Sequence, residues 1–397
     1  QQAAFEFIEE VQMKASGYQA EYGGAIGGVL NVITRSGGNE FHGEVIGYYS
    51  GSALNGKERD TLRLAIFGDD AEYVNYQDLY GKDEVHRIEA GFNLGGYILK
   101  DRLWFFTSFL PVFRNTTRNI DWQSSATAPD SSHTQKEQYY NGSFKLTTQP
   151  LRGLRLSASF MSNFNKYRGD LPARAGTDNP EKEWGLYGFN YPNFSGNITF
   201  DYTLSNNFLV SGRWGMFGEN TTNQQVQPTG PLYRFRHPTP GSAYGLATTN
   251  SMYPDIPAEF VKPRGWMNYG YYDAFVTNKR LKQRQSANLN FTYYVKLAGE
   301  HAWKAGFQWV QLHEDIDDTI KYPYVQFGWD SDFQYIDTGE RVRGKYGYYA
   351  VRGGEFTGPY GTFASVFSNR WALFIQDSCT PDFAQNLTLN LGVRAES

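Results

Sequence analysis

Polar and apolar residues alternate one by one over long stretches of this chain, and this pattern limits the possible folds more than any other feature. Successive side chains of a β-strand point to opposite faces, so these stretches are predicted to be strands with one apolar and one polar face. Leu391 and Phe291 are predicted on the apolar face, and Asn390 and Asn290 on the polar face. The alternation is clearest in residues 198–204, 286–297, 303–309 and 387–396.

Short and long connections also alternate along the chain. Short turns are predicted near Asp101, Arg152, Asn206 and Gly299, and a slightly longer one at 380–386. Between them lie long polar, aromatic or proline-bearing loops at about 52–84, 119–135, 168–192, 221–280 and 316–368. A meander of this kind places all its short turns at one end, which is typical of outer-membrane β-barrels with short periplasmic turns and long external loops.

About eleven strands follow from this division of the chain. They are expected at 41–51, 85–99, 103–118, 136–149, 154–167, 193–204, 208–220, 281–297, 302–315, 369–379 and 387–397. Single-chain bacterial barrels have an even number of strands, and plugged transporters have about 22. Eleven strands alone would leave two unpaired edges in lipid. The chain is therefore interpreted as part of a longer protein, in keeping with the lack of a signal peptide at its first residues.

The composition fits a β-rich membrane protein and excludes several other classes. Aromatic residues make up 17% of the 397 residues and there are 42 glycines, which disfavours an all-α protein. No apolar run approaches the ~18 residues of a transmembrane helix. The formal charge of −4 gives no sign of a nucleic-acid surface. The single cysteine, Cys379, rules out an intrachain disulfide and a zinc site built from several cysteines.

A glycine-rich segment precedes the first alternating strand. Residues 22–38 read YGGAIGGVLNVITRSGG, in which dense glycine allows close backbone packing and the run at 29–34 is predicted to be a short buried strand. This segment resembles the end of the plug domain of TonB-dependent outer-membrane transporters, with its Y-G-x-G-A-x-G-G-V-x-N-V-x-T-like sequence. Two hairpins of that family's barrel are resembled by residues 92–106 and by residues 371–378 with 386–394. Within the family, the sequence of these segments is most similar to the Oar-like branch.

The resemblance implies an all-β membrane protein of the cell outer membrane of a Gram-negative bacterium. The fold would be an antiparallel up-and-down transmembrane β-barrel, of which the chain supplies about half, with the end of an N-terminal plug domain. Residues 1–38 would be the C-terminal part of the plug. Residues 39–397 would be the N-terminal half of the barrel, with its long loops outside the cell.

The resemblance further implies a TonB-dependent receptor that takes up an extracellular ligand, which no motif identifies. The expected partners are TonB with ExbB–ExbD, and the outer-membrane lipid and lipopolysaccharide around the barrel; no nucleic acid and no cofactor are expected. The alternatives are an Oar-like outer-membrane protein that serves adhesion, envelope structure or protein export, and a soluble all-β binding protein. No nucleophile with a nearby base is recognisable, so no catalytic residue and no enzyme activity are expected.

Two groups of residues are candidates for function. Glu21 and Arg35 are expected to pair with lumen charges, because an unpaired buried charge is costly, or else to be solvated on the periplasmic side of the plug. The full set assigned to plug-to-barrel anchoring is Glu21, Tyr22, Gly23, Gly27, Gly28, Asn31 and Arg35. Aromatic residues at the end of the proline-rich loop 221–280 could contact a ligand or pack on neighbouring loops. These candidate ligand contacts are Trp266, Tyr269, Tyr271 and Tyr272.

No metal site is predicted from spacing, because the six histidines lack the spacing of metal ligands. The acidic run from Glu314 to Asp318, with Asp330 and Asp332 downstream, is compatible with Ca²⁺ ligation or with a solvated external loop.

Overall fold

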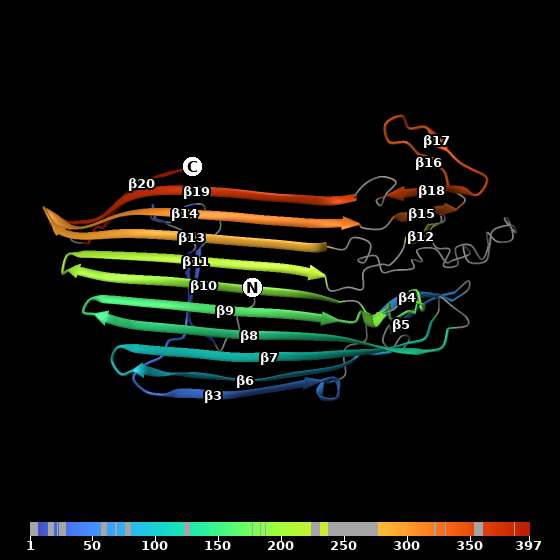
Figure 1. Cartoon of the computed structure of the whole chain (residues 1–397), viewed down its shortest axis with the longest axis horizontal. Coiled ribbons are helices and arrows are strands. Elements are labelled where there is room, and N and C mark those ends of the chain that lie inside the picture. The colour runs from blue at the N-terminus through green and yellow to red at the C-terminus, as the bar shows by residue number, and fades with distance from the viewer. Residues whose placement is uncertain are drawn as a thin grey trace.

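Most of the described chain is β-strand (Figure 1). The computed structural model describes residues 7–14, 20–21, 23, 29–56, 62–67, 70–75, 81–122, 128–176, 178–182, 184–186, 188–223, 231–236, 277–320, 323–329, 331–352, 360–384 and 386–397. Two short 3-10 helices, η2 (Ser52–Leu54) and η3 (Trp184–Leu186), lie in the connections. Among these residues, no helix has both the length and the apolar character needed to cross a bilayer.

Eleven strands form one antiparallel sheet. They are β3 (His42–Gly51), β6 (Glu84–Leu99), β7 (Leu103–Ile120), β8 (Ser131–Leu151), β9 (Leu154–Arg168), β10 (Gly188–Ser205), β11 (Phe208–Asn223), β13 (Thr277–Lys296), β14 (Gly299–Ile320), β19 (Tyr360–Pro381) and β20 (Leu389–Glu396). Each pairs with the next large strand along the chain, in the order just given. This meander confirms the predicted all-β, up-and-down architecture, and every predicted strand is present.

Several strands extend further toward the long connections than the sequence pattern predicts. β19 begins at Tyr360 instead of residue 369, and β14 ends at Ile320 instead of residue 315. Charged residues occupy both faces here, so the alternation is lost although the ladder of backbone hydrogen bonds continues. The acidic run that starts at Glu314 is therefore largely strand, which corrects its assignment to a solvated loop. Lys282 on β13 lies opposite Glu314 and supplies the opposite charge.

The short turns lie at one end of the sheet and the long connections at the other (Figure 1). The tight turns join β6 to β7, β8 to β9, β10 to β11 and β13 to β14, as the alternating connection lengths predict. At the first of them, Asp101 adopts a left-handed backbone with φ of 62°. The side-chain oxygen of Asn39 accepts hydrogen bonds from the Asp101 N–H at 2.9 Å and from the Trp104 indole at 2.7 Å, which stabilises this turn.

The long connections contain short strands where the sequence pattern predicts loops. β4 (Leu62–Phe67) pairs with β5 (Asp70–Asn75), and β16 (Phe333–Gln334) pairs with β17 (Arg341–Val342). β15 (Tyr324–Trp329) pairs with both β12 (Leu232–Arg236) and β18 (Gly347–Arg352). The connections before β13 and before β19 therefore share one sheet. These strands are too short for their alternation to stand out in the sequence.

The described residues before β3 do not join the large sheet. β1 (Ile8–Lys14) and β2 (Val29–Thr34) form an antiparallel sheet of their own. The described part of residues 7–38 is called the N-terminal segment below. The face of the large sheet that contacts it, through Lys145, Lys304 and Arg394 among others, is called the inner face.

The predicted separation of faces is confirmed at the four positions named above. The register places Asn290 and Asn390 on the inner face. Asn290 lies opposite Gly306, which is two residues from Lys304 and shares its face, and Asn390 lies four residues before Arg394 on β20. Phe291 and Leu391 lie on the outer face and expose 41% and 71% of their surface. Apolar side chains this exposed are expected on the lipid-facing surface of a barrel.

Aromatic residues mark both edges of the apolar band on the outer face. On β14 the band runs from Trp303, near the turn end, to Trp309. Tyr293 on β13 lies opposite Trp303, and Trp371 on β19 lies opposite Trp309. Aromatic belts are typical of both membrane interfaces of an outer-membrane barrel. The band therefore indicates which part of the wall lies in the bilayer.

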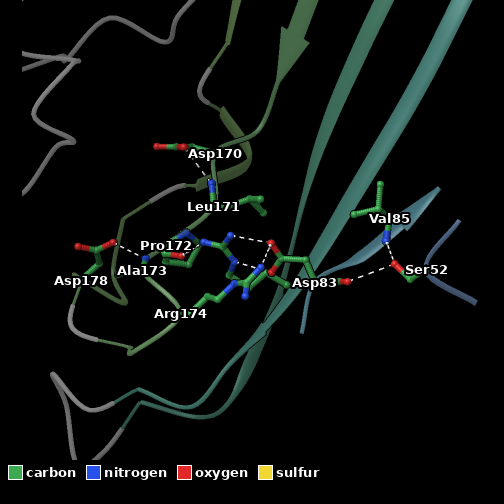
Figure 2. A network of polar contacts seen from close by, with 10 residues as sticks. Ser52, Asp83, Val85, Asp170, Leu171, Pro172, Ala173, Arg174 and Asp178 are labelled. Atoms are coloured by element: carbon green, nitrogen blue, oxygen red, sulfur yellow. Dashed lines mark hydrogen bonds and ion pairs between the residues drawn. The ribbon is translucent and has the colours of Figure 1, made fainter. Parts of the chain in front are cut away.

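A network of polar contacts joins separate connections at the loop end (Figure 2). Arg118 near the end of β7 donates two hydrogen bonds of 2.8 Å to the carboxylate of Asp83 and one of 2.6 Å to the carbonyl of Pro172. Arg174 donates to the same carboxylate at 2.9 Å. Burial alone would raise the pKa of the Asp83 carboxyl, but the two guanidinium groups hold that pKa below its usual range. The connection before β6 is thereby fixed to the one before β10.

An aromatic cluster supports the same region. Trp122 and Trp184 are buried together with Ile120. The two indole ring centroids are 6.5 Å apart, and His133 packs edge-on against both rings. The ammonium group of Lys182 lies 4.1 Å from the centroid of the Trp184 ring. These contacts form a small core outside the apolar band, in parts of the chain that the sequence pattern predicts as loops.

Arginine should be tolerated on one face of β10 and not on the other. Ile198 exposes 52% of its surface on the outer face, and its neighbour Asn197 lies on the inner face between Ser159 and Gly215. Ile198→Arg should lower the free energy of unfolding by about 2–4 kcal/mol because the charge enters hydrocarbon, whereas Asn197→Arg should cost less than about 1 kcal/mol. Urea unfolding of the full-length protein in lipid vesicles measures both. A larger loss at Asn197 would show that the register is displaced by one residue.

Asp83→Asn should loosen the loop end without unfolding the wall. The change leaves Arg118 and Arg174 facing a neutral amide, and we expect the joined connections to open more readily, by roughly 1–3 kcal/mol. Hydrogen-exchange protection of residues 81–84 and 169–176 measures the opening. The matched control is Asp382→Asn at the turn end, where the carboxylate lies 3.9 Å from Lys296 in an exposed pair. Loss of protection at the loop end in this control would contradict the prediction.

The same contact predicts how the loop end responds to pH. A carboxyl whose pKa is lowered by folding contributes stability that is present above the unfolded value of about 3.9, and this stability is lost as the pH falls through the folded value. Protection of residues 81–84 should therefore be constant between about pH 5 and pH 7 and fall only in stronger acid. A fall already near pH 6 would point to a histidine such as His133 instead of Asp83.

Candidate functional site

The main polar contact between the N-terminal segment and the wall surrounds Ala20 and Glu21. Arg394 on β20 donates a hydrogen bond of 3.2 Å to the carbonyl of Ala20. Gln308 on β14 donates one of 2.7 Å to the carbonyl of Glu21, and Gln376 on β19 accepts one of 3.2 Å from the Glu21 N–H. Side chains from three neighbouring strands therefore hold three backbone groups of two consecutive residues.

An ion pair completes this arrangement, which is called the Glu21 clamp. The ammonium group of Lys304 on β14 contacts the carboxylate of Glu21, and the two side chains are only 24% and 15% exposed. Arg394 also donates to Gln308 at 2.9 Å and to Glu396 at 3.0 Å, which fixes its guanidinium against the segment. A pair this buried is only partly screened by solvent, so loss of either charge would leave its partner poorly compensated.

Small residues permit the close approach at the clamp. A Cβ atom at Gly392 would lie 2.8 Å from the Cβ of Ala20, and a Cβ at Gly23 would overlap the guanidinium of Arg394. A side chain at Gly392 would push the segment and the wall apart, and one at Gly23 would displace the guanidinium of Arg394. Gly23 belongs to the residues assigned to anchoring from the sequence. Gly392 does not, although a glycine inside an alternating strand is a signal of close backbone approach.

A second contact lies at the end of β2. Lys145 on β8 donates a hydrogen bond of 2.7 Å to the carbonyl of Thr34. Arg35 lies 3.5 Å from Glu44 on β3, and Asn93 on β6 donates to the same carboxylate at 2.7 Å. The Arg35 and Glu44 side chains are 40% and 60% exposed, so this ion pair contributes little by itself.

The other residues assigned from the sequence are placed differently or lie outside the described chain. Asn31 donates a hydrogen bond of 3.3 Å to Gln12, so this contact stays inside the two-stranded sheet. The residues outside the described chain are Tyr22, Gly27, Gly28, Trp266, Tyr269, Tyr271 and Tyr272.

The wall side of the Glu21 clamp is the part that sequence reasoning misses. The alternation along β14, β19 and β20 predicts the face on which a side chain lies but not the residue that it contacts. This applies to Lys304, Gln308, Gln376 and Arg394. The pairing of β14 with β19, and of β19 with β20, brings the four side chains together.

Carboxylates of the acidic run on β14 contact other side chains of the protein. Glu314 lies 3.3 Å from Arg280 and 4.0 Å from Lys282, and Asp315 accepts a hydrogen bond of 2.6 Å from Ser365. In the part of the chain that the structure describes, no group of three or more histidine, cysteine or acidic residues could hold a metal ion. Cross-strand pairing therefore accounts for these carboxylates.

Comparison with known sequences gives two relatives. No family model matches the chain. The TonB-dependent transporter Oar of Myxococcus xanthus is 35% identical over 111 residues, which cover 28% of this chain and 9% of that protein. The ferrienterobactin receptor of Escherichia coli K12 is 25% identical over 233 residues, which cover 56% of this chain and 27% of that protein. The matches thus span less than a third of the length of either relative.

Solved outer-membrane transporters share the fold. The transporter YddB of Escherichia coli aligns with a TM-score of 0.57 at 12% identity, over 98% of this chain and 43% of that one. A mutant of the ferric enterobactin receptor of Pseudomonas aeruginosa gives a TM-score of 0.50 at 13% identity, over 98% of this chain and 44% of that one. The chain therefore spans less than half of each structure, and the likeness shows an outer-membrane β-barrel fold.

The named relatives are transporters and receptors, not enzymes, in agreement with the sequence of this chain, which predicts no enzyme activity. The fold and the relatives confirm the expected setting in the outer membrane. In sequence and in fold the chain is similar to TonB-dependent outer-membrane transporters, and its resemblance to the Oar type is confirmed.

Proposed function

We propose that the chain is part of a TonB-dependent outer-membrane transporter that takes up an extracellular ligand. In this proposal, residues 1–38 are the end of the plug and residues 39–397 are about half of the barrel wall. TonB, powered by ExbB–ExbD, supplies the force that moves the plug.

The way in which the wall holds the N-terminal segment supports this proposal. Among the described residues, the segment is joined to the large sheet by wall side chains and not by a backbone ladder. Four backbone groups each contact one wall side chain: the carbonyls of Ala20, Glu21 and Thr34, and the N–H of Glu21. Withdrawal of the segment therefore breaks no pairing within the wall.

The strength of these contacts suits a segment that is held at rest and released under force. A hydrogen bond inside a protein contributes about 0.5–1.5 kcal/mol net, so four of them and one partly buried ion pair sum to several kcal/mol. The side chains of the Glu21 clamp are polar, so water can replace the segment once it leaves. A continuous wall with a detachable inner segment suits transport better than a static role in adhesion or envelope structure.

Energised TonB should uncover the wall beneath Glu21. In the full-length protein with Cys379→Ser and Gln376→Cys, the new thiol stands where the side chain now accepts the Glu21 N–H. Maleimide should label this thiol slowly in cells that lack TonB and several-fold faster in cells that contain it, because the segment has to leave before the reagent can reach position 376. Asn390→Cys, which is exposed on the same face, is the matched control and should be labelled equally in both strains.

Glu21→Gln gives a second measurement on the same background. Lys304 loses its charged partner, so position 376 should be labelled about 5–30 times faster even without TonB, if the pair contributes about 1–2 kcal/mol. Labelling that is independent of TonB, together with no effect of Glu21→Gln, would show a fixed segment and would favour adhesion, envelope structure or protein export.

A further inference from the structure

Residues 37–41 connect β2 to β3 and lie against the turn end of β6 and β7. A Cβ atom at Gly37 would overlap the carbonyl oxygen of Phe105 and lie 2.5 Å from that of Gly96. Gly96 and Phe105 are paired in the register of β6 and β7, so Gly37 packs directly on the backbone of the wall. Gly38 differs, because a Cβ atom there would have no neighbour within 4 Å among the described residues. Gly37 is therefore enclosed by the wall and Gly38 is not.

Asn39 fixes the same stretch of chain through its side chain. Its side-chain oxygen accepts hydrogen bonds from the Asp101 N–H and the Trp104 indole, and its amide group donates one of 2.6 Å to the Asp101 carboxylate. The side chain thus satisfies three groups at the turn between β6 and β7, where Asp101 has a left-handed backbone. Removal of Asn39 from this position would deprive the Asp101 N–H and the Trp104 indole of these partners.

Phe41 completes the attachment directly before β3. Its ring lies over Gly96, where a side chain would overlap it, and the ring centroid is 4.8 Å from that of Tyr97. The next residue, His42, is the first of β3 and is already part of the large sheet. Residues 37–41 are therefore held by backbone packing, hydrogen bonds and aromatic contacts, and they are called the tether below.

The chain before Gly37 belongs to the two-stranded sheet of β1 and β2. The Arg35 N–H donates a hydrogen bond of 3.0 Å to the carbonyl of Phe7, so the backbone of Arg35 still follows β2. Ser36 lies between this bond and Gly37, and within the described part of the chain it forms no hydrogen bond or ion pair. One residue thus separates the part of the chain that follows β2 from the part that is fixed to the wall.

We propose that the tether stays on the wall when the part of the N-terminal segment before it withdraws, and that the chain pivots at Ser36. This inference rests on the proposed function, because it requires the segment to move. The wall contacts just upstream of Ser36 are made by side chains, at Thr34 and Arg35. The contacts of the tether involve the backbone of β6 and β7 and the turn that joins them, so their loss would also disturb the wall.

The two sets of contacts differ in how readily water replaces them. The pair of Arg35 with Glu44 is exposed, so its loss costs little. Gly37 packs on backbone carbonyls that cannot rotate aside as a side chain can, and Asn39 bonds to three groups at once. The chain should therefore part from the wall before Gly37. A tether that stays in place would return the segment to the same position after each withdrawal.

Cysteine labelling locates the pivot. In the full-length protein with Cys379→Ser, a single cysteine replaces Thr34, Gly38 or Glu40, and maleimide labelling is compared in cells with and without TonB. Thr34 is half-buried at rest, so Thr34→Cys should be labelled several-fold faster when TonB is present. Gly38→Cys has room for its side chain and Glu40→Cys replaces an exposed residue. Both should be labelled at the same rate in the two strains.

The outcomes separate this inference from the proposed function. Faster labelling of all three positions in the presence of TonB would place the pivot beyond the tether and overturn the inference, while the proposed function would stand. If neither Thr34→Cys nor Gln376→Cys responds to TonB, the proposed function fails, and the pivot fails with it.

Gly37→Ala tests the tether without TonB. The added methyl group meets the backbone of β6 and β7, so the chain should shift at Gly37 and carry Asn39 away from the turn. Hydrogen exchange of the Asp101 amide, measured on the purified full-length protein, should become about tenfold faster because Asn39 no longer accepts its hydrogen bond. Gly38→Ala is the matched control and should leave this exchange rate unchanged, because its methyl group enters open space.

Resistance to unheated detergent denaturation shows whether both alanine variants retain a folded wall. Unchanged exchange of the Asp101 amide in Gly37→Ala would overturn the tether, as would an equal increase in Gly38→Ala. If Gly37→Ala does not fold, the labelling of Gly38→Cys and Glu40→Cys still decides between a fixed and a mobile tether.

Discussion

Every backbone N–H and C=O group within a bilayer has to find its partner in the protein, because lipid offers none. In the large sheet, every strand between β3 and β20 meets this requirement by pairing with a neighbour on each side. Sequential antiparallel pairing collects the short turns at one end and the long connections at the other (Figure 1). It also sorts the side chains into an outer face that meets lipid, as at Phe291, and an inner face that can hold another part of the protein, as at Lys304.

The Glu21 clamp satisfies the same requirement without extending the sheet. Buried backbone groups need partners. Wall side chains supply them at Ala20 and Glu21, which lie outside the pairing of β1 with β2, and at Thr34, the last residue of β2. A third strand paired with the wall would satisfy these groups equally well, but it would make the segment part of the sheet. Gly23 and Gly392 allow side chains of ordinary length to make these contacts, because they remove the bulk that would separate the two surfaces.

The sequence predicts the strands and their faces wherever one face meets lipid and the other meets polar groups. The alternation is weaker in β7, where Phe106 and Leu110 lie on the inner face and are buried, so both faces are apolar. Glu21 and Arg35 could be singled out as charges in need of partners, but Lys304 and Glu44 become their partners only through pairings between distant segments. The contacts of Asp83 are beyond prediction for the same reason, since its partners come from other connections.

The two polar networks act at opposite ends of the wall. Lys304 lies near the turn between β13 and β14, and Lys145 lies near the turn between β8 and β9, so the N-terminal segment is held toward the turn end. Asp83 and its two guanidinium partners hold the connections at the loop end (Figure 2). Withdrawal of the segment therefore need not disturb the loop end in the described half of the wall.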